Sequence, residues 1–167
     1  MSLQGPVPLS PDHQVNAFAC GESIFDDWLK RRALATQSSG SSRTFVIADD
    51  ERQVVGYYSL AAGAVAPQTS AHRTARPNLA APIPVMVLAC LAVDVRAQGH
   101  KLGSAMLLDT FQRSVLVSQN TGVRALLAHA INENGQKFYE HYGFRTTSTH
   151  PITLMLRLEQ SLASFPG

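Results

Sequence analysis

Residues 93–103 have the residue types of a phosphate-binding turn. The segment reads V-D-V-R-A-Q-G-H-K-L-G, with an apolar run before it at residues 84–93 and the helix-forming run S-A-M-L-L after it. A strand that turns into a helix in this way directs free main-chain amides and a helix N-terminus toward one point, which suits a pyrophosphate. The spacing matches neither the P-loop nor the Rossmann pattern, so both of those interpretations are weak.

A second segment with chemical character lies at residues 132–144, N-E-N-G-Q-K-F-Y-E-H-Y-G-F. Asn132 is expected to cap a short helix, with Phe138 and Tyr142 on one of its faces. Gly143 supplies a left-handed residue that can end the helix. Tyrosine, with a reference pKa of about 10, is protonated at neutral pH, so Tyr139 can donate a proton. Taken alone, the pattern also fits a core aromatic side chain.

Length and composition indicate one globular domain, residues 1–167. The chain has 45% hydrophobic and 16% charged residues, which is ordinary for a globular protein and excludes a disordered one. Cys20 and Cys90 fit neither a metal site nor a disulfide framework, and no metal is expected. The apolar runs are too short to span a bilayer and the first residues do not form a signal-peptide pattern. A cytoplasmic protein without membrane contact is therefore expected.

Positive charge is concentrated in the middle of the chain, although the formal net charge is only +2. Residues 52–132 contain seven Lys or Arg residues and two Asp residues. Such a segment suits a phosphate-rich ligand, either a cofactor or a nucleic acid. An ordinary solvated surface explains the asymmetry equally well.

The order of expected elements predicts an α/β fold with a mixed sheet and helices on both of its faces. Helices are expected at residues 22–34 and 102–118 and after Asn132. Strands are expected at residues 7–9, 44–48, 53–62, 85–93, 123–130 and 152–158. A loop is expected at residues 37–42, and a longer, proline-bearing loop at residues 66–84. Tyr57 and Tyr58 are expected to face opposite sides of their strand.

The two chemical segments together resemble the signatures of the GNAT family of acetyl-CoA-dependent N-acetyltransferases. Arg96, Gln98, Gly99 and Gly103 stand where that family has its R/Q-x-x-G-x-G/A motif. Residues 132–144 resemble the family's "N…YE..GF" element. The family usually has a second glycine at the position of Lys101. Lys101 is either left-handed at a cost of about 1–2 kcal/mol or helical with its ammonium on a phosphate, and we favour the helical conformation.

The resemblance covers nearly the whole chain and implies the GNAT fold, with two central parallel strands that splay to admit acetyl-CoA. It implies that Tyr139 is the general acid that protonates the departing thiolate. It implies that strand amides hold the thioester carbonyl, that the turn binds the diphosphate, and that Asn132 belongs to the cofactor site. The residues implied for acetyl-CoA are Leu91, Ala92, Val93, Arg96, Gln98, Gly99, His100, Lys101, Leu102, Gly103, Ser104 and Asn132.

Five segments, among them F-A-C-G-E-S-I-F-D-D-W-L and P-I-P-V-M-V-L-A-C-L-A-V-D, are similar to the GNAT toxins of bacterial toxin–antitoxin pairs. This resemblance implies acetylation of the α-amine of aminoacyl-tRNA, a block of translation, and neutralisation by a ribbon-helix-helix antitoxin. We also expect a homodimer. Cys90 stands where those toxins usually carry arginine. The basic residues that we expect to contact tRNA are Lys30, Arg31, Arg32, Arg73 and Arg76.

The sequence is also compatible with other functions. The chain could acetylate a small amine or a protein N-terminus, or it could bind acetyl-CoA or an antitoxin without catalysis. No general base is evident, and His129 and His141 are better explained as structural histidines. Asp94 is expected to stabilise the end of its strand and the following loop. Cys90 is not expected to act as a nucleophile, because no neighbour in the sequence activates it.

Overall fold

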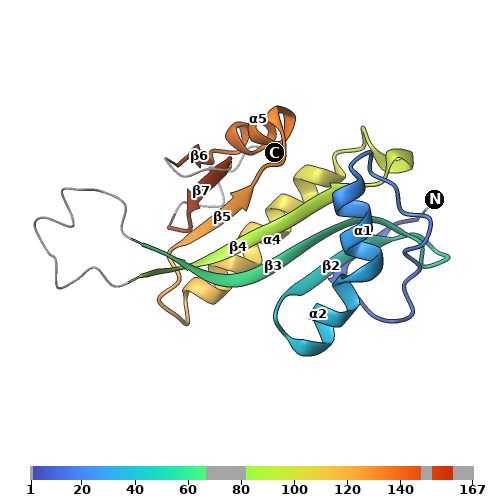
Figure 1. The fold of residues 1–167 in the computed structure, drawn as a ribbon, viewed down its shortest axis with the longest axis horizontal. Helices are drawn as coiled ribbons and strands as arrows, with labels where there is room; N and C mark the ends of the chain where they lie inside the picture. Colours follow the sequence, from blue (N-terminus) through green and yellow to red (C-terminus); the bar gives the residue numbers. More distant parts are fainter. Residues whose placement is uncertain (1, 67–81, 148–151, 160–167) are drawn as a thin grey trace, which may run out of the picture. The chain divides into compact units, whose positions relative to one another are not determined.

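The computed structural model describes residues 2–66, 82–147 and 152–159. The strands form a mixed seven-stranded sheet in the order β1-β2-β3-β4-β5-β7-β6, in which β4 and β5 are parallel (Figure 1). This arrangement confirms the predicted α/β class. The elements are β1 (Gln4–Pro8), α1 (Ser23–Arg31), α2 (Ala33–Ser39), β2 (Arg43–Ala48), β3 (Val54–Val65), β4 (Ile83–Val93), η2 (Val95–Ala97), α4 (Leu102–Ser118), β5 (Ala125–His129), α5 (Glu133–His141), β6 (Arg145–Thr146) and β7 (Thr153–Arg157).

The chain forms two compact parts. The first part contains residues up to Ala61 together with Leu88–Thr110, and the second contains Ala62–Val87 and the residues from Phe111 onward. The elements β3, β4 and α4 contribute to both parts. The single functional domain expected from the length stays a prediction.

Strand β3 organises the first part, because its two adjacent tyrosines face opposite sides as predicted. Tyr57 is fully buried, stacks on Trp28 with ring centroids 6.0 Å apart, and donates a hydrogen bond to the Phe25 carbonyl at 2.7 Å. Tyr58 is equally buried and donates a hydrogen bond to Asp109 on α4. Both phenols therefore meet polar partners, and the two tyrosines join β3 to α1 on one face and to α4 on the other.

The helix predicted at residues 22–34 is two helices, so that prediction is wrong at Arg32. This residue leaves helical geometry, with φ −120° and ψ −31°, between α1 and α2. The bend places Gln37 of α2 beside β2, where its amide accepts a hydrogen bond from the Thr44 amide at 2.7 Å and donates to the Thr44 carbonyl. Helix α2 continues to Ser39, so the first three residues of the loop predicted at residues 37–42 are helical.

The second part packs α5 beside β6 and β7 (Figure 1). Leu126 and Leu154 are fully buried, Leu156 and Phe144 nearly so. These side chains belong to the hydrophobic core. The two-residue strand β6 was not predicted, because so short a strand leaves no alternation in the sequence.

Candidate functional site

The turn after β4 is built around the buried carboxylate of Asp94. The carboxylate accepts hydrogen bonds from the Arg96 amide at 2.8 Å, from the Arg96 guanidinium at 2.8 and 2.9 Å, and from the Ala19 amide at 3.0 Å. The Asp94 amide in turn donates to the Val55 carbonyl of β3. Asp94 thus stabilises the strand end and the loop, as the sequence predicted.

The electrostatics of this carboxylate depend on its donors. Burial by itself raises the pKa of Asp94, because it disfavours the charged form. The hydrogen bonds from Arg96 and Ala19, together with the guanidinium charge, outweigh burial, so the pKa of Asp94 lies below its ordinary value. The same pairing raises the pKa of Arg96, whose side chain stays 47% exposed.

Gln98 provides a second set of side-chain hydrogen bonds that stabilises the same turn. Its side-chain amide donates to the Val93 carbonyl at 2.9 Å and to the Cys20 carbonyl at 3.0 Å. The side chain is therefore occupied in joining the end of β4 to the N-terminal segment, which the sequence did not indicate. Gly99 follows with φ +87°, a conformation that glycine adopts without strain.

Lys101 is left-handed, with φ +62°, and this finding corrects the helical conformation that we favoured. Helix α4 begins one residue later, as predicted, and the Lys101 carbonyl accepts hydrogen bonds from the Ala105 amide and the Ser104 hydroxyl. Lys101 thus occupies the position before the first helical residue. The amides of Leu102 and Gly103 belong to the first turn, where main-chain donors face the N-terminal end and suit an anion.

The residues predicted to hold the thioester carbonyl end strand β4. Leu91 and Val93 are half-buried and Ala92 is buried. The neighbouring Cys90 is buried against Tyr57, and burial raises the pKa of its thiol to about 11. A thiol with that pKa is protonated at neutral pH, which agrees with the expectation that Cys90 is no nucleophile.

In the second part, Asn132 and Tyr139 lie at the two ends of α5. The Asn132 side chain accepts a hydrogen bond from the Gly135 amide at 2.9 Å and caps the helix as predicted. Tyr139 is 5% exposed and packs against Phe138 and Phe144, with ring centroids 5.4 and 5.3 Å apart. Tyr142 packs against Phe138, also as predicted.

The turn after α5 has the conformation that the sequence predicted, and the two candidate histidines contact neighbouring side chains. Gly143 has φ +93°, the left-handed conformation predicted for the end of the helix. His129 lies within hydrogen-bonding distance of the Thr153 hydroxyl, at 3.2 Å. The exposed His141 packs edge-on against Tyr142. Both contacts agree with the structural roles expected of these histidines.

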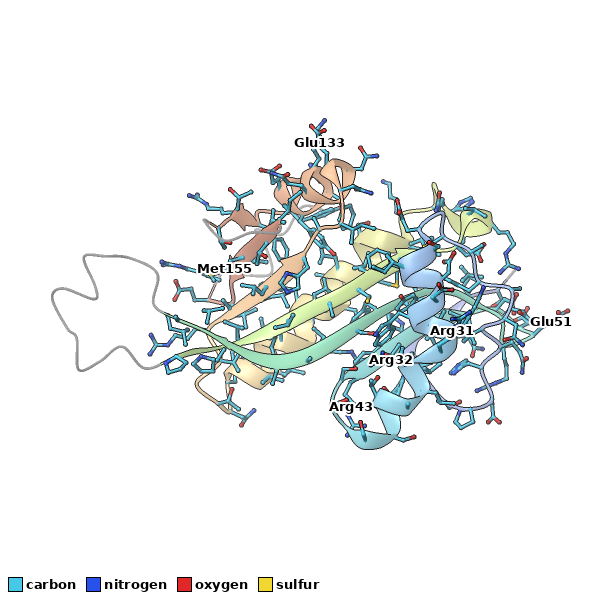
Figure 2. All side chains as sticks on the ribbon, viewed as in Figure 1. Arg31, Arg32, Arg43, Glu51, Glu133 and Met155 are labelled. Atoms are coloured by element: carbon cyan, nitrogen blue, oxygen red, sulfur yellow. The ribbon has the colours of Figure 1, made fainter. Side chains whose placement is uncertain are left out.

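The basic residues considered for tRNA are distributed over two segments. Lys30, Arg31 and Arg32 are all exposed where α1 ends and α2 begins. Arg31 and Arg32 are labelled in Figure 2. Arg73 and Arg76 lie outside the described residues. Over the described ranges, no group of three potential metal ligands occurs, and no helix has the length and apolar character to cross a membrane.

Comparisons with known proteins agree with this geometry. Residues 41–146 match the family model described as "Acetyltransferase (GNAT) domain". The chain is 41% identical to the "tRNA-acetylating toxin" of Mycobacterium tuberculosis (strain ATCC 25618 / H37Rv), with 95% of this chain and 94% of that protein covered.

Two solved structures share the fold at 22% identity. They are AtaTR bound with AcCoA, at a TM-score of 0.83, and AtaT complexed with acetyl-methionyl-tRNAfMet, at a TM-score of 0.78. The first match covers 95% of this chain and 94% of that one, and the second covers 93% and 94%.

The charge of Asp94 predicts a pH dependence of stability. Its lowered pKa contributes stability that is fully present above the unfolded-state pKa and is lost as the pH falls through the folded-state pKa. Asp94→Asn replaces one accepting oxygen by an amide donor, so we expect the free energy of unfolding to fall by about 1–3 kcal/mol at neutral pH. The acid-induced loss of stability should also become shallower. Urea denaturation between pH 7 and pH 3 measures both effects.

Asp27→Asn is the matched control for this measurement, because Asp27 is an exposed carboxylate on α1. We expect this control to retain the wild-type stability and its acid dependence. Equal destabilisation by both substitutions would show that the Asp94 contacts contribute nothing specific.

The left-handed backbone of Lys101 predicts a stabilising substitution. Lys101→Gly removes the unfavourable contact of Cβ with the backbone, although glycine gains entropy in the unfolded chain. We expect the net free energy of unfolding to rise by up to about 1 kcal/mol. Lys101→Ala removes the ammonium but keeps Cβ, so it should bring no such gain. Thermal unfolding of the two variants compares them, and equal melting temperatures would refute the assignment of strain.

Proposed function

Because the chain belongs to the GNAT family of acetyltransferases, we propose that it transfers the acetyl group of acetyl-CoA to the α-amine of aminoacyl-tRNA. Acetylation of that amine blocks translation, so the protein acts as a toxin. The observation that carries this proposal is the 41% identity, over 95% of the chain, to a tRNA-acetylating toxin. The turn after β4 and Tyr139 of α5, which match the family pattern in this sequence, support it.

The turn after β4 has the donors that an acetyl-CoA diphosphate requires. Main-chain amides at the start of α4 and the exposed Lys101 supply hydrogen bonds and positive charge. The Asp94 and Gln98 contacts hold these donors in place before the ligand arrives, which lowers the cost of ordering on binding. The remaining cofactor residues, from Leu91 to Val93 and Asn132, are proposed on the family pattern.

Acetyl-CoA supplies a thioester, whose carbonyl carbon accepts the attacking amine. The amine nitrogen forms the new C–N bond, the C–S bond breaks, and the electron pair stays on sulfur. Main-chain amides of residues 91–93 are proposed to stabilise the negative charge that develops on the carbonyl oxygen. The Tyr139 phenol donates its proton to the departing thiolate, and the proton lost by the amine passes to solvent.

We propose that the exposed Lys30, Arg31 and Arg32 contact tRNA phosphates, and that Arg73 and Arg76 do the same. We propose that a ribbon-helix-helix antitoxin neutralises the protein, and that the active species is a cytoplasmic homodimer. The exposure of the α1 end supports the tRNA contact, because exposed cations bind a polyanion without the cost of burying charge.

Total charged tRNA, incubated with radiolabelled acetyl-CoA, tests the reaction. We expect label in the aminoacyl-tRNA fraction and none in free amino acids, because most of the binding energy comes from the tRNA body. Polyamines and peptides are supplied in parallel reactions. Label in either of them, with charged tRNA unlabelled, would refute the proposed function.

Tyr139→Phe tests the proton donor. The substitution removes the hydroxyl and keeps the ring between Phe138 and Phe144, so the fold and acetyl-CoA binding should be preserved. We expect acetyl transfer to slow by roughly 10²–10⁴-fold, the range for a lost general acid. Tyr142→Phe is the control on the same helix and should retain near-wild-type turnover. Full activity in Tyr139→Phe would assign Tyr139 to the core alone.

A further inference from the structure

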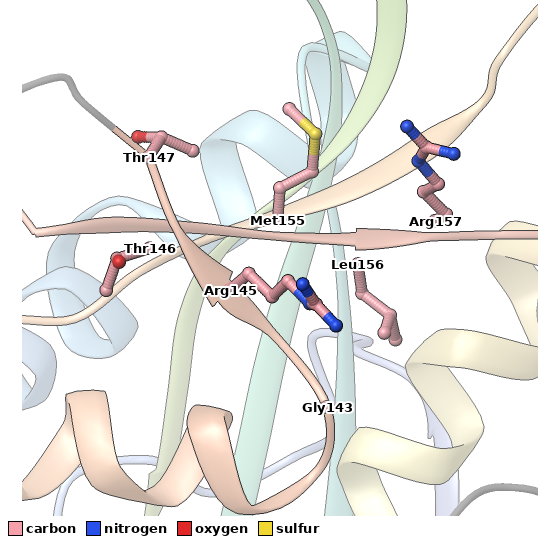
Figure 3. A pocket seen from close by; sticks show the side chains of 7 residues that line it. All are labelled: Gly143, Arg145, Thr146, Thr147, Met155, Leu156 and Arg157. Atoms are coloured by element: carbon pink, nitrogen blue, oxygen red, sulfur yellow. The ribbon is translucent and has the colours of Figure 1, made fainter.

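A groove in the second part lies along the edge of β7, where β6 separates from it (Figure 3). Its volume is about 490 Å³. The residues that line it are Gly143, Arg145, Thr146, Thr147, Met155, Leu156 and Arg157. Two of these side chains are cationic and none is a carboxylate. Neither arginine was among the residues predicted to bind substrate.

The strand register places an additional donor in this groove. The β6–β7 ladder pairs Arg145 with Met155 and Thr146 with Leu154. On the other side of β7, the Leu158 amide bonds to the Arg124 carbonyl, so the hydrogen-bonding groups of Leu158 and Leu156 face β5. The main-chain amide of Arg157 therefore faces the β6 side, beyond the last ladder pair.

The guanidiniums of Arg145 and Arg157 have freedom to bind a ligand. Both side chains are exposed. Arg157 approaches Glu159 at 3.4 Å, but the two side chains are 79% and 74% exposed, and an exposed pair of this kind is held weakly. A phosphate offers charged oxygens to both arginines and to the Arg157 amide, and guanidinium groups match phosphate geometry in a bidentate way.

We propose that this groove binds a phosphodiester segment of the tRNA substrate. This inference rests on the proposed function and adds a contact site to it. The half-buried Met155 gives the groove an apolar surface, against which a ribose or base can pack. A phosphate bound here contributes to tRNA affinity and to its salt dependence, while the reaction at the amine is unaffected.

An added peptide strand fits this edge less well. Beyond the β6 ladder, β7 continues for two residues, and of these Arg157 alone turns its main-chain donor toward the groove. Pairing with a peptide strand needs a row of alternating donors and acceptors. A phosphate needs only a few donors, and the two arginines that line the groove, together with the Arg157 amide, can supply them.

Arg145→Gln combined with Arg157→Gln tests the site. Binding of deacylated tRNA, followed by fluorescence anisotropy between 50 and 300 mM salt, gives affinity without requiring acetylation. We expect the double variant to bind about three- to tenfold more weakly, and the slope of log K against log[salt] to fall by about 1–2. In the acetylation assay, KM for charged tRNA should rise by a similar factor, with kcat and acetyl-CoA affinity unchanged.

Two further variants serve as controls. Lys137→Gln removes an exposed cation of the same part, paired with Glu133 on α5, and should leave tRNA affinity unchanged. Arg145→Lys with Arg157→Lys keeps the charge and should restore most of the salt slope. Unchanged tRNA affinity and salt slope in the double Gln variant would overturn the proposal. So would a loss of antitoxin binding or of self-association with tRNA binding intact, because the groove would then bind protein.

The outcomes also separate this proposal from the proposed function. If the wild type binds tRNA with a salt slope that depends on the two arginines but acetylates no charged tRNA, the groove stands and the reaction fails. If the wild type acetylates charged tRNA and the double variant matches it in KM, the reaction stands and the groove fails.

Discussion

The Asp94 carboxylate is the constraint on which the turn after β4 depends. Burial of a carboxylate without hydrogen-bond donors would strongly destabilise the fold, so neighbouring groups must supply donors. The donors are the Ala19 amide in the N-terminal segment and Arg96 in the turn itself. Gln98 repeats this connection through the Val93 and Cys20 carbonyls. The turn contains only one short 3₁₀ helix among its described residues, so side-chain hydrogen bonds, and not regular secondary structure, hold its conformation.

That ordering explains how a strained residue is tolerated in the turn. Lys101 keeps a left-handed backbone at a cost of about 1–2 kcal/mol. The Asp94 and Gln98 contacts fix the chain before Lys101, and the first turn of α4 fixes it afterwards. The strained residue lies between these two ordered segments. A glycine would avoid the cost, but it would remove a cation from a position beside the helix N-terminus. The lysine thus lowers the free energy of unfolding relative to glycine, but it adds a positive charge at the place where a diphosphate is proposed to bind.

Local patterns predicted much of the fold, and tertiary contacts decided the rest. Helix α4 has the predicted bounds, because its apolar run begins at a clear glycine-bearing turn. The break at Arg32 was not predicted, because no glycine or proline marks it in the sequence. The hydrogen bonds between Gln37 and Thr44 of β2 join two segments and leave no trace in the helical periodicity. The conformation of Lys101 was predicted wrongly, because spacing alone does not reveal which residue of a turn has φ above zero. The groove formed by Arg145 and Arg157 was not predicted, because the two residues are brought into one groove by the β6–β7 register, which the sequence does not reveal.

The residues proposed for tRNA contact and the residue proposed for catalysis differ in how deeply they are buried. Among the described residues, Asp94 is the one fully buried acidic or basic side chain, and its environment is saturated with donors. The cations proposed to contact tRNA, such as Arg31 and Arg157, are exposed, and exposed charges can be substituted with little effect on folding. Tyr139, by contrast, is packed between two aromatic rings, so its chemistry and its packing are coupled. A change in the proposed tRNA contacts can therefore occur on the surface, whereas a change of the proposed proton donor requires the core of the second part to adapt.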